Sequence, residues 1–116
     1  MTPQPAVSRG DVWLVRLDPV RGHEQGGTRP ALVVSADLLN RGAAGLAIVV
    51  PLTTRDRGIN LHVRLEPPEG GLAQPSFAKC EDVRSISAER LVKPLGAVGR
   101  ATMAQVEDRL RILLCL

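Results

Sequence analysis

Short apolar runs separated by polar and glycine-rich stretches recur along most of the chain, a spacing typical of a small, mainly β protein. The run at 31–36 is nearly continuous in valine and leucine, as in a strand buried on both faces. At 61–65 the residues Leu61, Val63 and Leu65 alternate with polar ones, which predicts a half-exposed strand with these three side chains inward. Further strands are predicted at 11–17, at 46–53, where Pro51 indicates an edge or a bulge, and from 76 to about 83.

The last segment carries the clearest helical pattern. Met103, Val106, Leu110 and Leu113 recur on one face, and Thr102, followed three residues later by Gln105, has the form of a capping box. Short helical turns are predicted at 37–41, with Asp37 as the cap, and at 87–90, and a short strand at 91–92. These elements predict a mainly β (α+β) fold, a small and strongly curved antiparallel barrel with short helical turns and a C-terminal α-helix.

The end of this helix is apolar on all sides, because Ile112, Leu114 and Leu116 lie outside the inward face. Two interpretations are about equally supported: burial against a partner subunit, or packing into the protein's own core. Residues 1–8 are expected to be a disordered lead, and residues 9–116 to form a single domain, since the chain has no internal repeat or linker.

Composition adds a bias toward phosphate-bearing partners. The formal charge is +3, and the isoelectric point of about 9.5 is just above the value of ~9 that marks basic nucleic-acid-binding domains. The first 64 residues contain eight basic and five acidic residues, so the whole excess lies there. Thirteen of the fifteen basic residues are arginine, whose planar fork matches phosphate, although a GC-rich genome would also enrich arginine. Only Trp13 and Phe77 are aromatic, which argues against a platform that stacks bases.

Several other classes are excluded by what the sequence contains. No apolar run is long enough to span a membrane, and the first residues lack the features of a signal peptide, so we expect a cytoplasmic protein. Cys80 and Cys115 have no metal-ligand spacing and are expected to be small, semi-buried residues. His23 and His62 lie far apart, no carboxylate pair has ligand spacing, and no phosphate-binding loop motif is present, so neither a metal nor a cofactor is expected.

The stretch 21–30 concentrates chargeable side chains in a glycine-rich loop that leads into the strand predicted at 31–36. Pro30 disfavours the helical region for the residue before it, so Arg29 is expected to be extended at the root of that strand. Arg29, together with Thr53 at the end of another strand and Glu24 and His23 in the loop, could meet at one rim of the barrel. Arginine stabilises the charge of a pentacoordinate phosphorus, a hydroxyl can donate to a phosphate oxygen, and a carboxylate or imidazole can accept a proton from a ribose 2′-OH.

Several segments then carry a resemblance to one family. The block Arg9-Gly10-Asp11-Val12-Trp13, followed by Leu17-Asp18-Pro19 and by the run from Gly22 to Val34 (GHEQGGTRPALVV), resembles the opening of the MazF/PemK family of toxin endoribonucleases. The later segments IVVPLTT at 48–54 and EDVRSISAERL at 81–91 match in the same order. The resemblance covers roughly residues 9–116.

The resemblance implies an SH3-like barrel of the PemK/CcdB type that forms a homodimer. The implied function is the toxin of a type II toxin–antitoxin system, an mRNA interferase that inhibits translation and growth. It would cleave single-stranded RNA at a short sequence without a metal, by attack of the 2′-OH, leaving 2′,3′-cyclic phosphate and 5′-OH ends. The implied partner is a cognate MazE-like antitoxin in a prokaryotic cytoplasm.

The family's catalytic arginine falls on Arg29 and its catalytic threonine on Thr53. Because arginine stays protonated at ordinary pH, we expect Arg29 to stabilise the phosphorane and to protonate the leaving 5′ oxygen, and Thr53 to orient the phosphate. Glu24 or His23 is the candidate general base, and the choice between them stays open. RNA contacts are expected from Gln25, Gly26, Gly27, Thr28, Arg55, Arg57, Asp82 and Arg84.

One of these positions departs from the family, because many members carry glutamine where this chain has Asp82. An acid there would change base recognition or weaken phosphate binding. Arg84 has an equally supported alternative as a surface or interface salt bridge. Two other functions remain on the same fold: a CcdB-like gyrase poison, disfavoured because the only tryptophan, Trp13, is not on the last helix, and a degenerate toxin that only binds antitoxin, disfavoured because Arg29 and Thr53 are intact.

Overall fold

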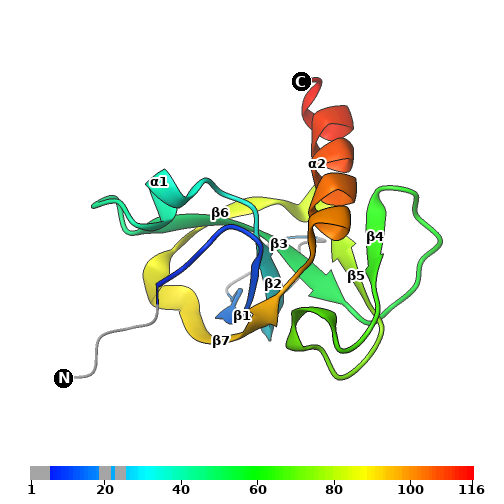
Figure 1. Cartoon of the computed structure of the whole chain (residues 1–116), viewed down its shortest axis with the longest axis horizontal. Helices are drawn as coiled ribbons and strands as arrows, with labels where there is room; N and C mark the ends of the chain where they lie inside the picture. Colours follow the sequence, from blue (N-terminus) through cyan, green and yellow to red (C-terminus); the bar gives the residue numbers. More distant parts are fainter. Residues whose placement is uncertain (1–5, 19–21, 23–25) are drawn as a thin grey trace.

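The computed structural model describes residues 6–18, 22 and 26–116. In these residues, seven strands form one antiparallel sheet with the path β4-β5-β3-β2-β1-β7, and β6 pairs with β3 beside that path (Figure 1). The strands are β1 (Asp11–Arg16), β2 (Thr28–Val33), β3 (Leu46–Thr53), β4 (His62–Leu65), β5 (Ser76–Lys79), β6 (Arg84–Ser87) and β7 (Leu91–Ala97). The helices are α1 (Asp37–Asn40) and α2 (Arg100–Leu114), with short 3-10 turns η1 (Glu69–Gly71), η2 (Cys80–Asp82) and η3 (Ala88–Arg90).

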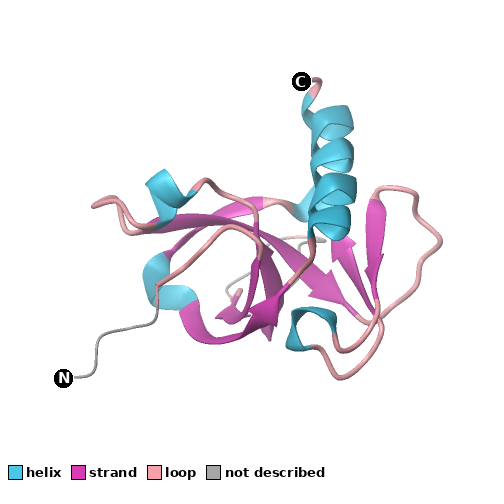
Figure 2. Ribbon diagram, in the orientation of Figure 1, coloured by secondary structure: helices cyan, strands magenta, loops and turns pink. Residues whose placement is uncertain are grey.

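The predicted mainly β fold with a C-terminal helix is confirmed. The strands curve around the core (Figure 2), but the sheet is not closed, because its path ends at β4 on one side and β7 on the other. The term barrel therefore describes the curvature of the sheet in this chain and not a closed ring of hydrogen-bonded strands.

Strand β3 is the centre of the sheet. One of its edges pairs with β2, while the other pairs first with β6, up to Val49, and then with β5, from Leu52. The predicted strand from 76 to about 83 is wrong as one element, because the chain leaves the sheet at η2 and returns as β6. The edge position predicted from Pro51 is wrong, because β3 has partners on both sides. Pro51 instead lies where the ladder on one side passes from β6 to β5, which fits its inability to donate a backbone hydrogen bond.

Two apolar clusters cover the two faces of the sheet, as the pleat of the strands requires. The first is covered by α2, whose Val106 is fully buried while Met103, Leu110 and Leu113 pack against it, as predicted for this helix face. It also contains Val12, Leu32, Val50, Leu52, Val63, Leu65, Ala78 and Cys80. The second cluster contains Trp13, Val15, Leu17, Ala31, Val33, Val49, Ile86 and Leu91.

The start of α2 differs from the prediction. The helix begins at Arg100 with Gly99 as its N-cap, so the expected capping box of Thr102 and Gln105 is wrong. Instead, the Glu69 carboxylate, thirty residues earlier, accepts hydrogen bonds from the Gly99 N–H at 2.9 Å and the Thr102 hydroxyl at 2.7 Å. A carboxylate at a helix N-terminus is favoured by the exposed N–H groups and the helix dipole.

The other end of α2 projects beyond the sheet (Figure 1). Ile112, Leu114 and Leu116 are 61%, 54% and 86% exposed. Packing of these side chains into the protein's own core is therefore wrong, and burial against a partner stays a prediction.

Strand β7 is longer than the predicted strand at 91–92. Pro94 and Gly96 give weak strand signals, but pairing with β1 extends the strand from Leu91 to Ala97.

The backbones of η1 and β7 lie very close together at Gly71 and Gly96. A Cβ added to Gly71, at φ +71, would lie 1.9 Å from the carbonyl oxygen of Leu95, and one added to Gly96 would lie 2.6 Å from the Gly71 nitrogen. Only glycines allow η1 and β7 to touch this closely.

The segments before β1 and after β2 are held together by side chains. Val7 packs against the second cluster, and the Ser8 N–H donates to Asp11 at 2.8 Å, so the end of the predicted disordered lead contacts the sheet, while residues 1–5 lie outside the described residues. Asp37 is not the cap of α1, because Ala36 holds that position. Asp37 instead accepts a hydrogen bond from the Arg9 N–H at 2.7 Å, which lowers the pKa of its carboxyl group.

Candidate active site on one face of the sheet

Arg29 lies inside β2 and not before it, because the strand begins at Thr28 and continues through Pro30. The extended backbone predicted for Arg29 is thus present, and Pro30 pairs with Leu14 of β1. The Arg29 side chain is exposed, and its Nε donates a hydrogen bond of 2.6 Å to the Gly26 carbonyl oxygen. This bond holds part of the guanidinium against the loop that precedes the strand.

Thr53 is the last residue of β3 and is 6% exposed. The pairing of β2 with β3 ends at Ala31 and Pro51, and the same register continued by two residues sets Arg29 level with Thr53. Side chains an even number of residues apart along a strand share a face. Arg29 therefore lies on the face of Ala31, and Thr53 on the face of Val49, which is the face of the second cluster. The Thr53 hydroxyl oxygen accepts a hydrogen bond from the Arg55 N–H at 3.2 Å.

The base of the loop before β2 is fixed by backbone hydrogen bonds. The Leu17 N–H donates to the Gly27 carbonyl oxygen, and the Gly27 N–H donates to the Asp18 carboxylate at 3.0 Å. Gly27 has a φ of +77, in the left-handed region that favours glycine. The exposed Thr28 follows and pairs with Arg16. Three predicted residues of this loop, His23, Glu24 and Gln25, lie outside the described residues.

Strands β5 and β4 extend the same face beyond Thr53. Thr53 pairs with Phe77, and Phe77 pairs with Arg64, whose guanidinium carbon lies 5.6 Å from the centre of the phenyl ring. One step along β5, Lys79 pairs with His62. Because the intervening Ala78 and Val63 are in the first cluster, Lys79 and His62 lie on the face of Thr53.

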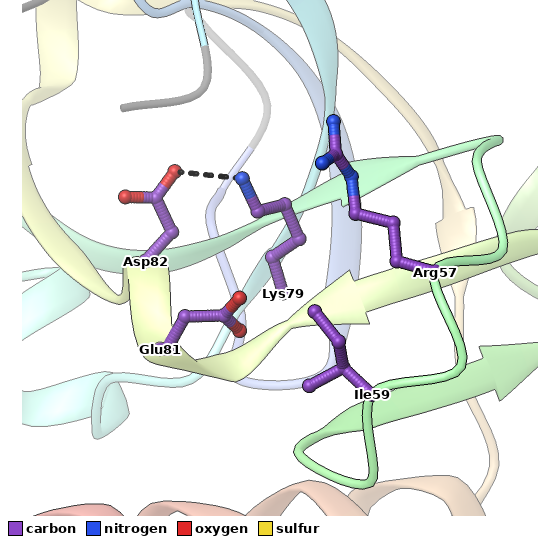
Figure 3. A pocket seen from close by; sticks show the side chains of 5 residues that line it. All are labelled: Arg57, Ile59, Lys79, Glu81 and Asp82. Atoms are coloured by element: carbon purple, nitrogen blue, oxygen red, sulfur yellow. Dashed lines mark ion pairs between the residues drawn. The ribbon is translucent and has the colours of Figure 1, made fainter. Parts of the chain in front are cut away.

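A pocket of about 350 Å³ opens beside this row, lined by Arg57, Ile59, Lys79, Glu81 and Asp82 (Figure 3). The Lys79 ammonium lies 3.8 Å from the Asp82 carboxylate, and both side chains are largely buried. Of the predicted RNA-contacting residues, Arg57 and Asp82 therefore meet at one pocket, and the structure adds Lys79 and Glu81, which the sequence pattern did not identify.

His62 is buried beneath the pocket residue Glu81. Its side chain is 2% exposed, and its Nε2 lies 2.8 Å from a Glu81 carboxylate oxygen. Its Nδ1 is buried and has no hydrogen-bond partner in the described part of the chain. The alternation at 61–65 predicts His62 on the exposed face, which is wrong, because its side chain is buried with Glu81 of η2 in contact with it.

Arg84 and Arg55 lie apart from this pocket. Arg84 is half-buried on β6, and its guanidinium donates to the Leu17 carbonyl oxygen at 3.4 Å. Arg55 is exposed in the loop after β3 and contributes its backbone N–H to Thr53. Neither lines the pocket beside Thr53.

Other chemistries receive no support from the described residues. No group of three or more histidine, cysteine or acidic side chains could hold a metal ion in the described ranges. Cys80 is fully buried, and burial raises the pKa of its thiol to about 11, which disfavours a thiolate nucleophile. In the part of the chain that the structure describes, no helix is long and apolar enough to cross a membrane.

Comparison with known proteins assigns the fold first. A crystal structure of MazF from Deinococcus radiodurans superposes with a TM-score of 0.86 at 30% identity, covering 97% of this chain and 100% of that one. A MazE–MazF structure from the same organism superposes with a TM-score of 0.79 at 30% identity, over 97% and 99% of the two chains. The mainly β sheet with its terminal helix is thus the MazF fold.

The sequence comparisons identify the family. The model of the PemK-like, MazF-like toxins of type II toxin–antitoxin systems matches residues 8–114. The endoribonuclease MazF9 of Mycobacterium tuberculosis is 40% identical over 113 residues, which cover 93% of this chain and 96% of that protein. The chain therefore belongs to the PemK/MazF family of toxins, as its motifs predicted. Trp13 is fully buried in the second cluster, so the tryptophan of a gyrase poison has no counterpart on α2.

Proposed function

We propose that this chain is the toxin of a type II toxin–antitoxin system and that it cleaves single-stranded RNA as an endoribonuclease. Its membership of a family whose relatives are named endoribonucleases supports this function over gyrase poisoning. The observation that supports the chemistry is the register of β2 and β3, which, continued past Ala31 and Pro51, sets Arg29 level with Thr53 on one face of neighbouring strands.

The reaction we propose needs no metal or cofactor. The ribose 2′ oxygen attacks the adjacent phosphorus and loses its proton to a base, and the bond from phosphorus to the 5′ oxygen breaks. The products are a 2′,3′-cyclic phosphate and a 5′-hydroxyl end. Glu24 or His23 is the proposed base.

Arg29 supplies the positive charge for this reaction. The phosphorane carries more charge than the ground state, so a guanidinium placed for it lowers the barrier. Arg29 also gives a proton to the leaving 5′ oxygen. Since the Thr53 oxygen already accepts the Arg55 N–H, the hydroxyl hydrogen can donate to a non-bridging phosphate oxygen.

The RNA would extend from this centre over the loop before β2 and over the pocket beside Thr53. Gln25, Gly26, Gly27 and Thr28 would contact it on one side, together with Arg84, which bonds Leu17 at the base of this loop, and Arg55, Arg57 and Asp82 would contact it on the other. The net charge of +3 favours association with a polyanion.

The proposed partners are a second copy of the chain and a MazE-like antitoxin. The relatives from Deinococcus radiodurans include a MazE–MazF structure, and the exposed apolar residues Ile112, Leu114 and Leu116 give this chain a surface to bury in a homodimer. The site of action would be the cytoplasm of a bacterium, where translated RNA is found.

The function is tested by incubating the purified protein with a mixed RNA in EDTA and mapping both ends of the products. We expect cleavage at a short sequence that leaves a 5′-hydroxyl, which a kinase labels without prior phosphatase treatment. Intact RNA, or cleavage only after a divalent metal is added, would contradict the proposal.

A further inference from the structure

We infer that the pocket lined by Arg57, Ile59, Lys79, Glu81 and Asp82 binds one nucleobase of the RNA and selects a base that carries an amino group. This inference rests on the proposed ribonuclease function and names a source of its sequence preference. Lys79 is the specificity-determining residue that neither the motifs nor the family assignment identify.

The position of the pocket follows from the strand register. Lys79 lies two residues after Phe77, which pairs with Thr53, so its side chain is on the face of Thr53, about 7 Å further along the strand. A nucleotide neighbouring the one bound at Thr53 therefore passes over the pocket. Figure 3 shows Arg57, Lys79 and Asp82 directed toward the same side of it.

The charges of the pocket favour a base over a phosphate. Its lining carries two cations, Arg57 and Lys79, and two anions, Glu81 and Asp82. A phosphate would meet two carboxylates in a partly buried space, where like charges are poorly screened. A base instead offers donors to the carboxylates and acceptors to the ammonium.

The Lys79 ammonium has N–H donors available for a bound base. In the described part of the chain its ammonium makes an ion pair of 3.8 Å with Asp82 and no shorter hydrogen bond, although the side chain is only 13% exposed. An ammonium has three donors, so a largely buried one gains from a carbonyl or ring-nitrogen acceptor. The Glu81 carboxylate lies 2.8 Å from His62 Nε2, a contact that holds a second acceptor in the pocket lining.

This arrangement matches adenine, cytosine or guanine, each of which has an amino group next to an acceptor. Uracil presents no amino group, only one N3–H between two carbonyl groups, so it can donate to one carboxylate but sets a carbonyl oxygen beside the other. The pocket should thus discriminate against uracil at one position of the cleavage sequence, by roughly tenfold or more.

The test uses the full-length protein and a set of short RNAs that contain the mapped cleavage site, with each flanking position varied to all four bases. We expect the wild type to disfavour uracil at one flanking position. In Lys79→Met, an uncharged chain of similar length, and in Asp82→Asn, the ratio of the cleavage rate for the best amino-bearing base to that for uracil should fall at least about fivefold. Lys93→Met, which changes the only other lysine, on the exposed part of β7, is the matched control and should keep the wild-type preference.

The outcomes separate this inference from the proposed function. If the wild type cleaves no RNA, the proposed function fails. If it cleaves and Lys79→Met and Asp82→Asn lower the rate equally for all four bases, the pocket does not read a base and the inference is wrong. A weaker salt dependence of cleavage in Lys79→Met with unchanged base preference would show that it holds a phosphate, which also overturns the inference. Melting of each variant confirms that it is folded.

Discussion

The hydroxyl oxygen of Thr53 accepts a hydrogen bond from the backbone N–H of Arg55, 3.2 Å away. The bond fixes the rotamer of an almost buried threonine and leaves its hydrogen to donate outward. A side chain at the end of the central strand, β3, thereby becomes a directed donor.

Removing this donor should slow cleavage without unfolding the protein. Thr53→Val keeps the shape of the side chain and should lower the single-turnover rate by about 10²–10³, whereas Thr53→Ser should retain much of it. Single-turnover cleavage of a labelled RNA measures both rates. If Thr53→Val cleaves as fast as the wild type, the hydroxyl has no part in the reaction.

Glu69 should stabilise α2 from outside the helix. Its carboxylate accepts two hydrogen bonds, from Gly99 and Thr102, so Glu69→Ala should lower the free energy of unfolding by about 1–3 kcal/mol. Urea denaturation measures the loss. Glu66→Ala removes an exposed carboxylate paired with Arg64 and should change the free energy by less than about 0.5 kcal/mol. Equal losses in the two variants would refute the role of Glu69 as a cap.

The N-terminus of α2 shows how far the sequence predicts the fold: the local pattern indicates Thr102 as the cap, whereas the hydrogen bonds there go to Glu69, distant in sequence. The strands predicted at 11–17 and 46–53 and the inward face of α2 follow from local apolar patterns and are present, whereas the strand predicted at 31–36 is displaced toward the N-terminus, because β2 runs from Thr28 to Val33. The true cap, the break at η2 and the length of β7 depend on partners distant in sequence. Lys93-Pro94-Leu95-Gly96 becomes a strand because it pairs with β1, a tertiary contact that overrides weak local signals.

The site shows the same division. Arg29 and Thr53 were recognised from motifs, and their level positions on β2 and β3 agree with that prediction without testing their roles. Lys79 and His62 were missed, because a lysine and a histidine within strands gain meaning only from the pairing of β3, β5 and β4. Because every second residue of a strand lies on the same face, Lys79, two residues after Phe77, shares the face of Thr53 once the pairing of Thr53 with Phe77 is known.

Gly71 should tolerate no side chain. A Cβ there would lie 1.9 Å from the Leu95 carbonyl oxygen, and its φ is +71, so Gly71→Ala should cost at least about 3 kcal/mol through both overlap and backbone strain. Gly58 has a similar φ of +64 but open space around it, and Gly58→Ala should cost only about 1–2 kcal/mol. Thermal unfolding compares the two, and a Gly71→Ala variant as stable as Gly58→Ala would show that η1 and β7 can move apart.

The two cysteines should react at very different rates. Cys115 is exposed, whereas Cys80 is buried and its thiol pKa is raised to about 11. At pH 8 the native protein should release one equivalent of thiolate product from a disulfide reagent quickly and the second only on denaturation. Cys115→Ser should abolish the fast phase. A fast phase that persists in this variant would place Cys80 within reach of solvent.

The raised pKa of Cys80 also sets a direction for stability. The folded protein holds this proton more tightly than an unfolded chain with the ordinary value of 9.0. Its contribution is therefore complete below about pH 9 and is lost as the pH rises toward 11. The wild type should lose stability over this interval more steeply than Cys80→Ala when urea midpoints are compared, and parallel losses would contradict the shift.

The catalytic role of Arg29 is tested by the single-turnover cleavage rate of Arg29→Ala in EDTA on the RNA that the wild type cuts best. Arg29 lies level with Thr53, and its charge is proposed to stabilise the phosphorane, so we predict a rate at least about 10²–10³ lower than that of the wild type. Arg100→Ala, which removes an exposed arginine at the start of α2, should cleave at the wild-type rate. Cleavage by a folded Arg29→Ala protein within a few-fold of the wild type would contradict a role for the Arg29 charge in the reaction.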